Sequence, residues 1–206
     1  ESFKPGTHML DLERSKMDSL RTAYWQTDTS IGKNSWYYTK NWIPKSAEDL
    51  VADLMDIVSK NGCLLLNIGP RKDGIIPDDQ KKTLLDIGAW LKVNGESVYG
   101  SKYYDVYGEG PTKTATGHLS EDKNQGFTQE DIRFTMNKGA LYATVLKAPT
   151  KDVHIKYLTD SKINIKSIKL LGSDAKIEFE QSAEGTIITL PKDVNLSYAW
   201  VFKIEM

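Results

Sequence analysis

The stretch SKNGCLLLNIGPRKDGIIP, residues 59–77, decides the fold. From Cys63 to Leu66 every residue is apolar, whereas a strand with one face in water alternates apolar and polar residues. The run is also too short to cross a bilayer. We therefore predict a strand that is buried on both faces and is followed by a turn at Lys72-Asp73-Gly74.

An amphipathic helix is predicted on each side of this strand. Ser46 suits the N-cap of the first helix, whose apolar residues recur at helical spacing until Asn61-Gly62. The second helix opens near Pro77-Asp78 and ends at Asn94-Gly95. A helix, a doubly buried strand and a second helix form the unit of a parallel α/β sheet or barrel.

The second half of the chain has a different pattern. Residues 110–126 are polar and rich in Gly, Ser and Thr, which predicts a linker or a long exposed loop. We divide the chain into an α/β part, residues 1–102, and a β-sandwich, residues 103–206. Short alternating segments predict antiparallel strands of the sandwich at residues 131–136, 140–147, 153–158, 165–171, 175–179, 185–190 and 198–204.

Composition excludes several classes of partner. With 27 basic and 28 acidic residues the net charge is -1, so no electrostatic attraction to nucleic acid or to an anionic membrane surface is expected. No apolar run is long enough for a membrane span. The single cysteine, Cys63, excludes an intrachain disulfide, and we predict that it is a small buried hydrophobic residue.

Metal and cofactor motifs are absent from the sequence. His8, His118 and His154 are far apart, and no Cys or carboxylate stands beside them at a ligand spacing. The region of Gly69 and Gly74 has neither the G-x-G-x-x-G nor the Walker pattern. We therefore predict no metal site and no nucleotide site.

Aromatic residues are concentrated between residues 8 and 42, where Glu13 and several Asp residues also lie. One interpretation is a platform that stacks on sugar rings, with a carboxyl group as general acid. The other is an aromatic packing cluster with solvated charges. Composition alone does not decide between these two interpretations. The aromatic residues concerned are Tyr24, Trp25, Trp36, Tyr37, Tyr38 and Trp42.

Two longer stretches resemble a known enzyme family. They are WQTDTSIGKNSWYY and DLVADLMDIVSKNGCLLLNIGPRKDGIIPDDQKKTLLDIGAWLKVNGESVYGS. Both resemble the α-L-fucosidases of glycoside hydrolase family 29, which carry Trp-Glu, Ser-Trp-Gly-Tyr, Leu-Leu-Leu-Asn-Ile-Gly-Pro and Asn-Gly-Glu in the same order. The similarity is nearly continuous from Trp25 to Gly100.

The resemblance implies a (β/α)8 (TIM) barrel followed by a β-sandwich, with this chain holding the last part of the barrel. It also implies retaining exo-hydrolysis of terminal α-L-fucose from glycans by an Asp nucleophile and a Glu acid/base, without a cofactor. The chain opens at Glu1 without an initiator Met or a signal peptide. We expect a fragment, inactive alone, whose nucleophile lies upstream and whose protein is secreted or periplasmic.

The resemblance assigns roles to five residues. Glu13, within Leu12-Glu13-Arg14, is the expected general acid/base, and the alternative is an exposed loop carboxylate. Trp36 is expected to lie against fucose and its methyl group. Trp25, Gln26 and Tyr37 are also expected to contact the substrate. Trp25 and Gln26 stand at the Trp-Glu position, where the family's carboxylate has become a neutral amide. Tyr37 replaces a Gly, and would strain the loop or narrow the pocket if that Gly has a positive φ.

Two other functions stay open at this point. A fucosidase-like fold without activity stays possible because Gln26 and Tyr37 depart from the family pattern. A carbohydrate-binding or structural sandwich module would need exposed aromatic rings, yet alternation buries most of the candidates, namely Phe127, Phe134, Tyr142, Tyr157, Phe179, Tyr198 and Trp200. The expected partners are a fucosylated glycan and either the missing part of the barrel or a second copy of the chain.

Overall fold

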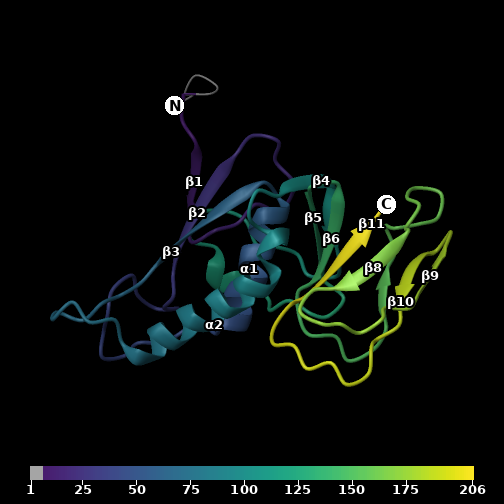
Figure 1. The fold of residues 1–206 in the computed structure, drawn as a ribbon. Coiled ribbons are helices and arrows are strands. Elements are labelled where there is room, and N and C mark those ends of the chain that lie inside the picture. Colours follow the sequence, from purple (N-terminus) through teal and green to yellow (C-terminus); the bar gives the residue numbers. More distant parts are fainter. Residues whose placement is uncertain (1–6) are drawn as a thin grey trace.

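The computed structural model describes residues 7–206 and has three layers (Figure 1). The first layer is a parallel sheet of β1 (Leu10–Glu13), β2 (Trp25–Ser30) and β3 (Gly62–Asn67), in that order. It is the part of an α/β barrel that the sequence predicted. None of the helices within residues 7–206 has the length and apolar character needed to cross a membrane.

Two helices form the middle layer, as predicted. They are α1 (Ala47–Ser59) and α2 (Asp78–Asn94), and the short helix η1 (Gly95–Ser97) follows. The Ser46 hydroxyl accepts a hydrogen bond from the Asp49 N–H at 3.0 Å, which confirms the predicted N-cap. Asn61 ends the first helix with a φ of 68°.

The third layer is the predicted antiparallel sandwich. One sheet has the order β4-β5-β6-β11-β8 and the other the order β7-β10-β9. A further short helix, η2 (Glu121–Lys123), lies in the connection between β4 and β5. The strands are β4 (Lys102–Glu109), β5 (Ile132–Asn137), β6 (Ala140–Val145), β7 (Val153–Ile155), β8 (Ser167–Leu170), β9 (Phe179–Ser182), β10 (Gly185–Ile188) and β11 (Trp200–Glu205).

The five-stranded sheet packs on both faces. Alternate residues of β6, such as Leu141 and Ala143, join the core between the two sheets. Their neighbours, Ala140 and Tyr142, join a second core with Val51 of α1 and with residues of α2. The α/β part and the sandwich therefore share a hydrophobic interface, and the division at residues 102 and 103 stays a prediction.

The double burial predicted for β3 is wrong in this structure. Cys63 is exposed and Leu65 is 55% exposed, so the strand buries only one face. The described residues place α1 against the other face, where a Cβ on Gly62 would meet Trp25 and Ile57. The prediction that Cys63 is buried fails for the same reason, since nothing within residues 7–206 covers its side of the sheet.

Two predictions in the second half also need correction. The strand predicted at residues 175–179 lies at Phe179–Ser182 instead, because the tight turn into β10 sets the register and pairs Ser182 with Gly185. Residues 110–126 are a loop, but not a freely exposed linker. Ser120 is fully buried, and the Glu121 N–H donates to the Arg14 carbonyl at 2.9 Å.

Candidate active site

Alternation along the parallel strands gathers polar side chains on one face of the sheet. Asp11 pairs in register with Gln26, and Glu13 pairs with Asp28. These four side chains point away from the face that holds Trp25 and α1. The Gln26 amide donates to a carboxylate oxygen of Asp11 at 3.3 Å, so the amide has a local partner on this face.

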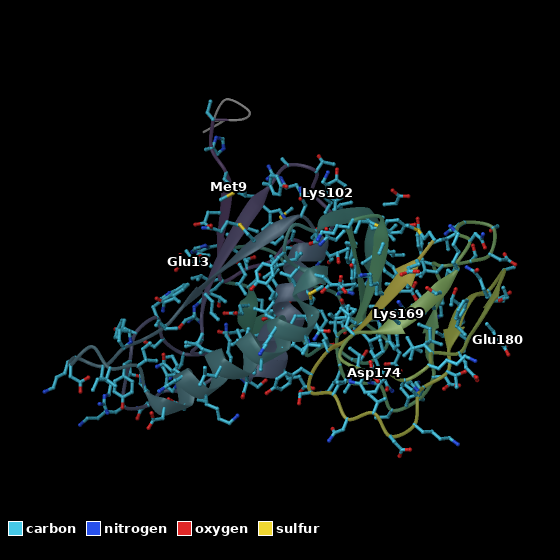
Figure 2. All side chains as sticks on the ribbon, viewed as in Figure 1. Met9, Glu13, Lys102, Lys169, Asp174 and Glu180 are labelled. Carbon is cyan, nitrogen blue, oxygen red and sulfur yellow. The ribbon has the colours of Figure 1, made fainter. Side chains whose placement is uncertain are left out.

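Glu13 is exposed at the last position of β1. Figure 2 shows it at the opposite end of this strand from Met9, on the side of the molecule remote from Glu180 of the sandwich. The carboxyl ends of parallel strands form the active-site face of a (β/α)8 barrel. The structure thus places the expected acid/base on the expected face, at a strand end rather than within a loop.

A cavity of about 390 Å³ adjoins Glu13. One wall is formed by β1 and the residues after it, and the other by Thr116, Gly117 and His118 of the 110–126 loop. The Leu119 N–H donates to the Glu13 carbonyl at 3.3 Å, which anchors this loop beside the strand. The connection into the sandwich therefore forms part of the surroundings of Glu13.

The surroundings of Asp28 disfavour the charged form of its carboxylate. Burial raises its pKa above the usual range, and the nearby charges of Asp11 and Glu13 raise it further. Its Oδ1 atom is buried and has no hydrogen-bond partner among the described residues. When Asp28 is ionised, its negative charge repels that of Glu13, and its Oδ1 atom has no hydrogen bond from the described residues to stabilise the charge.

Trp36 lies at the same end of the sheet as Glu13. The guanidinium carbon of Arg14, the residue after Glu13, is 4.6 Å from the centre of the Trp36 ring. The Asn67 amide, at the end of β3, donates to the Trp36 carbonyl at 2.5 Å. The structure therefore gathers the ends of β1 and β3 around Trp36.

Tyr37 is 71% exposed beside Trp36 and does not adopt a positive φ. The backbone strain expected from a side chain at this position is therefore absent. The backbone of this loop instead lies close to Gly69, where an added Cβ would be 2.7 Å from the backbone nitrogen of Tyr38. The loop after β3 packs directly on the loop that holds Trp36 and Tyr37.

Comparison with known proteins gives the family. A family model described as alpha-L-fucosidase matches residues 2–96, and one described as alpha-L-fucosidase C-terminal domain matches residues 124–205. This chain belongs to the α-L-fucosidases of glycoside hydrolase family 29. The two matches, in this order, follow the two kinds of architecture that the structure shows.

Individual fucosidases align with most of the chain. Tissue alpha-L-fucosidase of Rattus norvegicus is 30% identical over 200 residues, covering 93% of this chain and 39% of the relative. Alpha-L-fucosidase of Dictyostelium discoideum is 28% identical, covering 90% and 39%. The structure of the Thermotoga maritima alpha-fucosidase in complex with fucose is 29% identical with a TM-score of 0.74, covering 97% and 43%. The chain thus spans about two fifths of the length of the curated relatives it matches.

One of the residues expected to contact substrate does not lie on the face that carries Glu13. Trp25 is completely buried, and its indole N–H donates to the Lys60 carbonyl at 2.9 Å. Its ring packs over Gly62 on the face of the sheet that α1 covers. Trp25 is therefore a packing residue, and the face that carries Glu13 lies on the other side of the sheet.

Glu121 was not among the residues predicted for the site. Its carboxylate accepts hydrogen bonds from the Thr29 hydroxyl at 2.7 Å and from the Lys45 ammonium, and it lies 3.5 Å from the Arg14 guanidinium. Burial lowers the pKa of Lys45, although the Glu121 charge opposes this shift. A lone Glu in a polar, Gly-rich stretch looks the same as any solvated loop residue, so no local signal marked it.

The other sequence predictions have mixed outcomes. Of the candidate rings of a carbohydrate-binding sandwich, Phe134, Tyr142 and Trp200 are buried. The other four are partly buried against the two hydrophobic cores, so they do not form an exposed aromatic strip; they are Phe127, Tyr157, Phe179 and Tyr198. Within residues 7–206 no group of three or more His, Cys, Asp or Glu side chains is placed to hold a metal ion. The prediction of chemistry without a metal or cofactor stays a prediction.

Proposed function

We propose that this chain carries the acid/base side of the active site of a retaining exo-α-L-fucosidase, which removes terminal α-L-fucose from glycans. The proposal is supported by membership of the α-L-fucosidase family and by the solved fucose complex of the similar Thermotoga maritima enzyme. The observation that carries it is the position of Glu13, at the carboxyl end of a parallel strand and next in the chain to Arg14, whose guanidinium lies against Trp36.

In the proposed mechanism Glu13 acts twice. Its carboxylic acid first protonates the glycosidic oxygen of the leaving group, while an Asp nucleophile attacks the anomeric carbon. Its carboxylate then takes a proton from the water that releases fucose from the enzyme. The exposed side chain and the adjoining cavity of about 390 Å³ leave room for a leaving group. We place the nucleophile on another barrel strand, since no Asp of this chain stands in the family's nucleophile motif.

Three further residues have proposed roles in binding the sugar. The half-buried indole of Trp36 offers an apolar surface to the fucose ring and its methyl group. Gln26 has an amide on the Glu13 side of the sheet, which suits hydrogen bonding to sugar hydroxyls. The exposed Tyr37 ring follows Trp36 in the chain. Its proposed role is to narrow the entrance of the sugar-binding site and so to influence which aglycones are accepted.

The partner and the location follow from the same proposal. The open face that carries Cys63 and Leu65 is the surface we expect the remaining barrel strands to cover. A second copy of the chain on this face is the competing occupant. A secreted or periplasmic location is proposed from the substrate class alone.

A direct experiment combines activity with stereochemistry. An aryl α-L-fucoside is supplied to this polypeptide, alone and together with the remaining part of a full-length barrel, and the first-formed fucose anomer is identified by NMR. We expect no turnover by the chain alone and α-L-fucose as the first product of the completed protein. β-L-Fucose as the first product would contradict retention, and turnover by the chain alone would contradict the placement of the nucleophile.

A further inference from the structure

Arg14 follows Glu13 directly and has an unusual backbone conformation. Its φ is 43°, in the left-handed region that residues with a Cβ rarely occupy. Hydrogen bonds hold this conformation from both sides, since the Arg14 N–H donates to the Asp28 carbonyl at 2.9 Å and its carbonyl accepts from the Glu121 N–H at 2.9 Å. Such conformations persist where the surroundings fix them, and they cluster at functional sites.

The Arg14 side chain connects β1 to the loop that holds Trp36. One guanidinium nitrogen donates to the Lys33 carbonyl at 2.7 Å and the other terminal nitrogen to the Gly32 carbonyl at 3.1 Å. The guanidinium carbon lies 4.6 Å from the centre of the Trp36 ring. One planar group therefore contacts both the backbone at the start of this loop and the indole at its end.

Glu121 fixes the guanidinium from the sandwich side. Its carboxylate lies 3.5 Å from Nη1 of Arg14, and the two side chains are 15% and 11% exposed. A lysine could not reproduce this set of contacts, because it has no planar fork to bind two carbonyls and stack on a ring at once. The contacts thus require arginine specifically.

We propose that Arg14 is a positioning residue that orients the Trp36 indole relative to Glu13 and thereby sets the preference for the methyl group of fucose. This inference rests on the proposed function. The guanidinium stabilises one orientation of the indole, and Trp36 remains half-buried, so part of the ring is accessible to a sugar. An indole held in place favours a methyl group over a hydroxymethyl group, and a mobile indole discriminates less between the two.

The test uses the full-length protein and two substrates. An aryl α-L-fucoside and the aryl α-L-galactoside differ only by a hydroxyl group on C6. For Arg14→Lys we expect kcat/KM for the fucoside to fall by about tenfold and kcat/KM for the galactoside to change by less than about threefold, because a single methyl contact is worth roughly 10- to 200-fold. Trp36→Phe is expected to lower the ratio of kcat/KM for the fucoside to kcat/KM for the galactoside by the same factor. The double variant with Arg14→Lys and Trp36→Phe should lower this ratio little further than either single variant does.

Arg21→Lys is the matched control. Arg21 lies in the same segment and donates to the Tyr24 carbonyl at 3.1 Å, whereas within residues 7–206 the guanidinium that stacks on the Trp36 ring is that of Arg14. Its variant should leave the ratio unchanged. If Arg14→Lys does not fold, Glu121→Gln supplies the second measurement, since it removes the charge that faces Arg14 and should lower the same ratio to a smaller extent.

The outcomes separate the two proposals. A wild-type protein that cleaves neither substrate contradicts the proposed function itself. A wild-type protein that prefers the fucoside, with Arg14→Lys or Glu121→Gln variants that lose activity equally on both substrates, shows a merely structural role and overturns the inference. An unchanged ratio and unchanged rates in the folded Arg14→Lys variant overturn it as well.

Discussion

Asp56 of α1 and Arg133 of β5 form a buried ion pair, with 2.7 Å between Oδ1 of the carboxylate and Nε of the guanidinium. The Lys60 ammonium binds the other carboxylate oxygen at 2.8 Å. Burial disfavours the charged carboxylate, but Arg133 and Lys60 outweigh it, so the pKa of Asp56 lies below its usual value. This buried cluster joins the α/β part to the sandwich.

Asp56→Asn should destabilise the protein strongly. The variant leaves two buried cations without their carboxylate, and removing one partner of a buried ion pair costs about 3–5 kcal/mol. The free energy of unfolding in urea measures the effect. Asp86→Asn is the matched control, because the Lys82–Asp86 pair lies at the surface, where water and salt screen the attraction, and its loss should cost far less. Equal losses in the two variants would contradict the importance of the buried cluster.

Lys60 should make stability depend on alkaline pH. Burial lowers its pKa from 10.5 to about 8 in the folded protein, despite the opposing charge of Asp56. Between these values the unfolded chain binds more protons than the folded chain, so the free energy of unfolding rises with pH. Relative to Lys60→Met, the wild-type protein should gain about 3 kcal/mol between pH 7 and pH 11. A difference that stays constant across this range would refute the lowered pKa.

The Ser46 cap should contribute measurably to α1. Ser46→Ala removes the acceptor of the Asp49 N–H and should cost about 1 kcal/mol in the free energy of unfolding. Ser161→Ala, in an exposed sandwich loop where the hydroxyl contacts only the Thr159 hydroxyl, should change stability by less than about 0.5 kcal/mol. Matching losses would show that the cap is not what stabilises the helix.

The open face of the sheet should be visible to thiol reagents. Cys63 is exposed in this chain, so it should react with a thiol reagent under native conditions. A polypeptide extended by the remaining barrel strands should protect it at every protein concentration. Protection that grows with the concentration of the isolated chain would instead indicate a second copy on this face.

Local patterns predicted much of the fold. Helix caps and helical spacing depend on neighbouring residues, so Ser46 and the ends of α1 and α2 were placed correctly. The burial of β3 depends on what lies across the sheet, which a run of apolar residues does not reveal. β4 was not predicted, because its residues lie where the chain changes from helical to alternating patterns, which suggested a domain boundary rather than a strand.

The site was harder to predict than the fold. Glu13 was proposed from the family resemblance alone, since an isolated acidic residue carries no local signal of catalysis. Trp25 and Trp36 look alike in sequence, but alternation within β2 buries the first, and the loop geometry leaves the second half-buried. Arg14 and Glu121 meet across more than a hundred residues of chain, a contact that only the folded structure brings about.

The acid/base role of Glu13 is tested most directly by the dependence of rate on the leaving group. In the full-length protein, Glu13→Ala should lower kcat/KM by about 10²- to 10⁴-fold for fucosides whose leaving group needs protonation. It should lower kcat/KM only slightly for a dinitrophenyl fucoside, whose leaving group departs as the anion. A loss of the same size for both classes of substrate, or no loss for either, would contradict the assignment of Glu13 as the general acid.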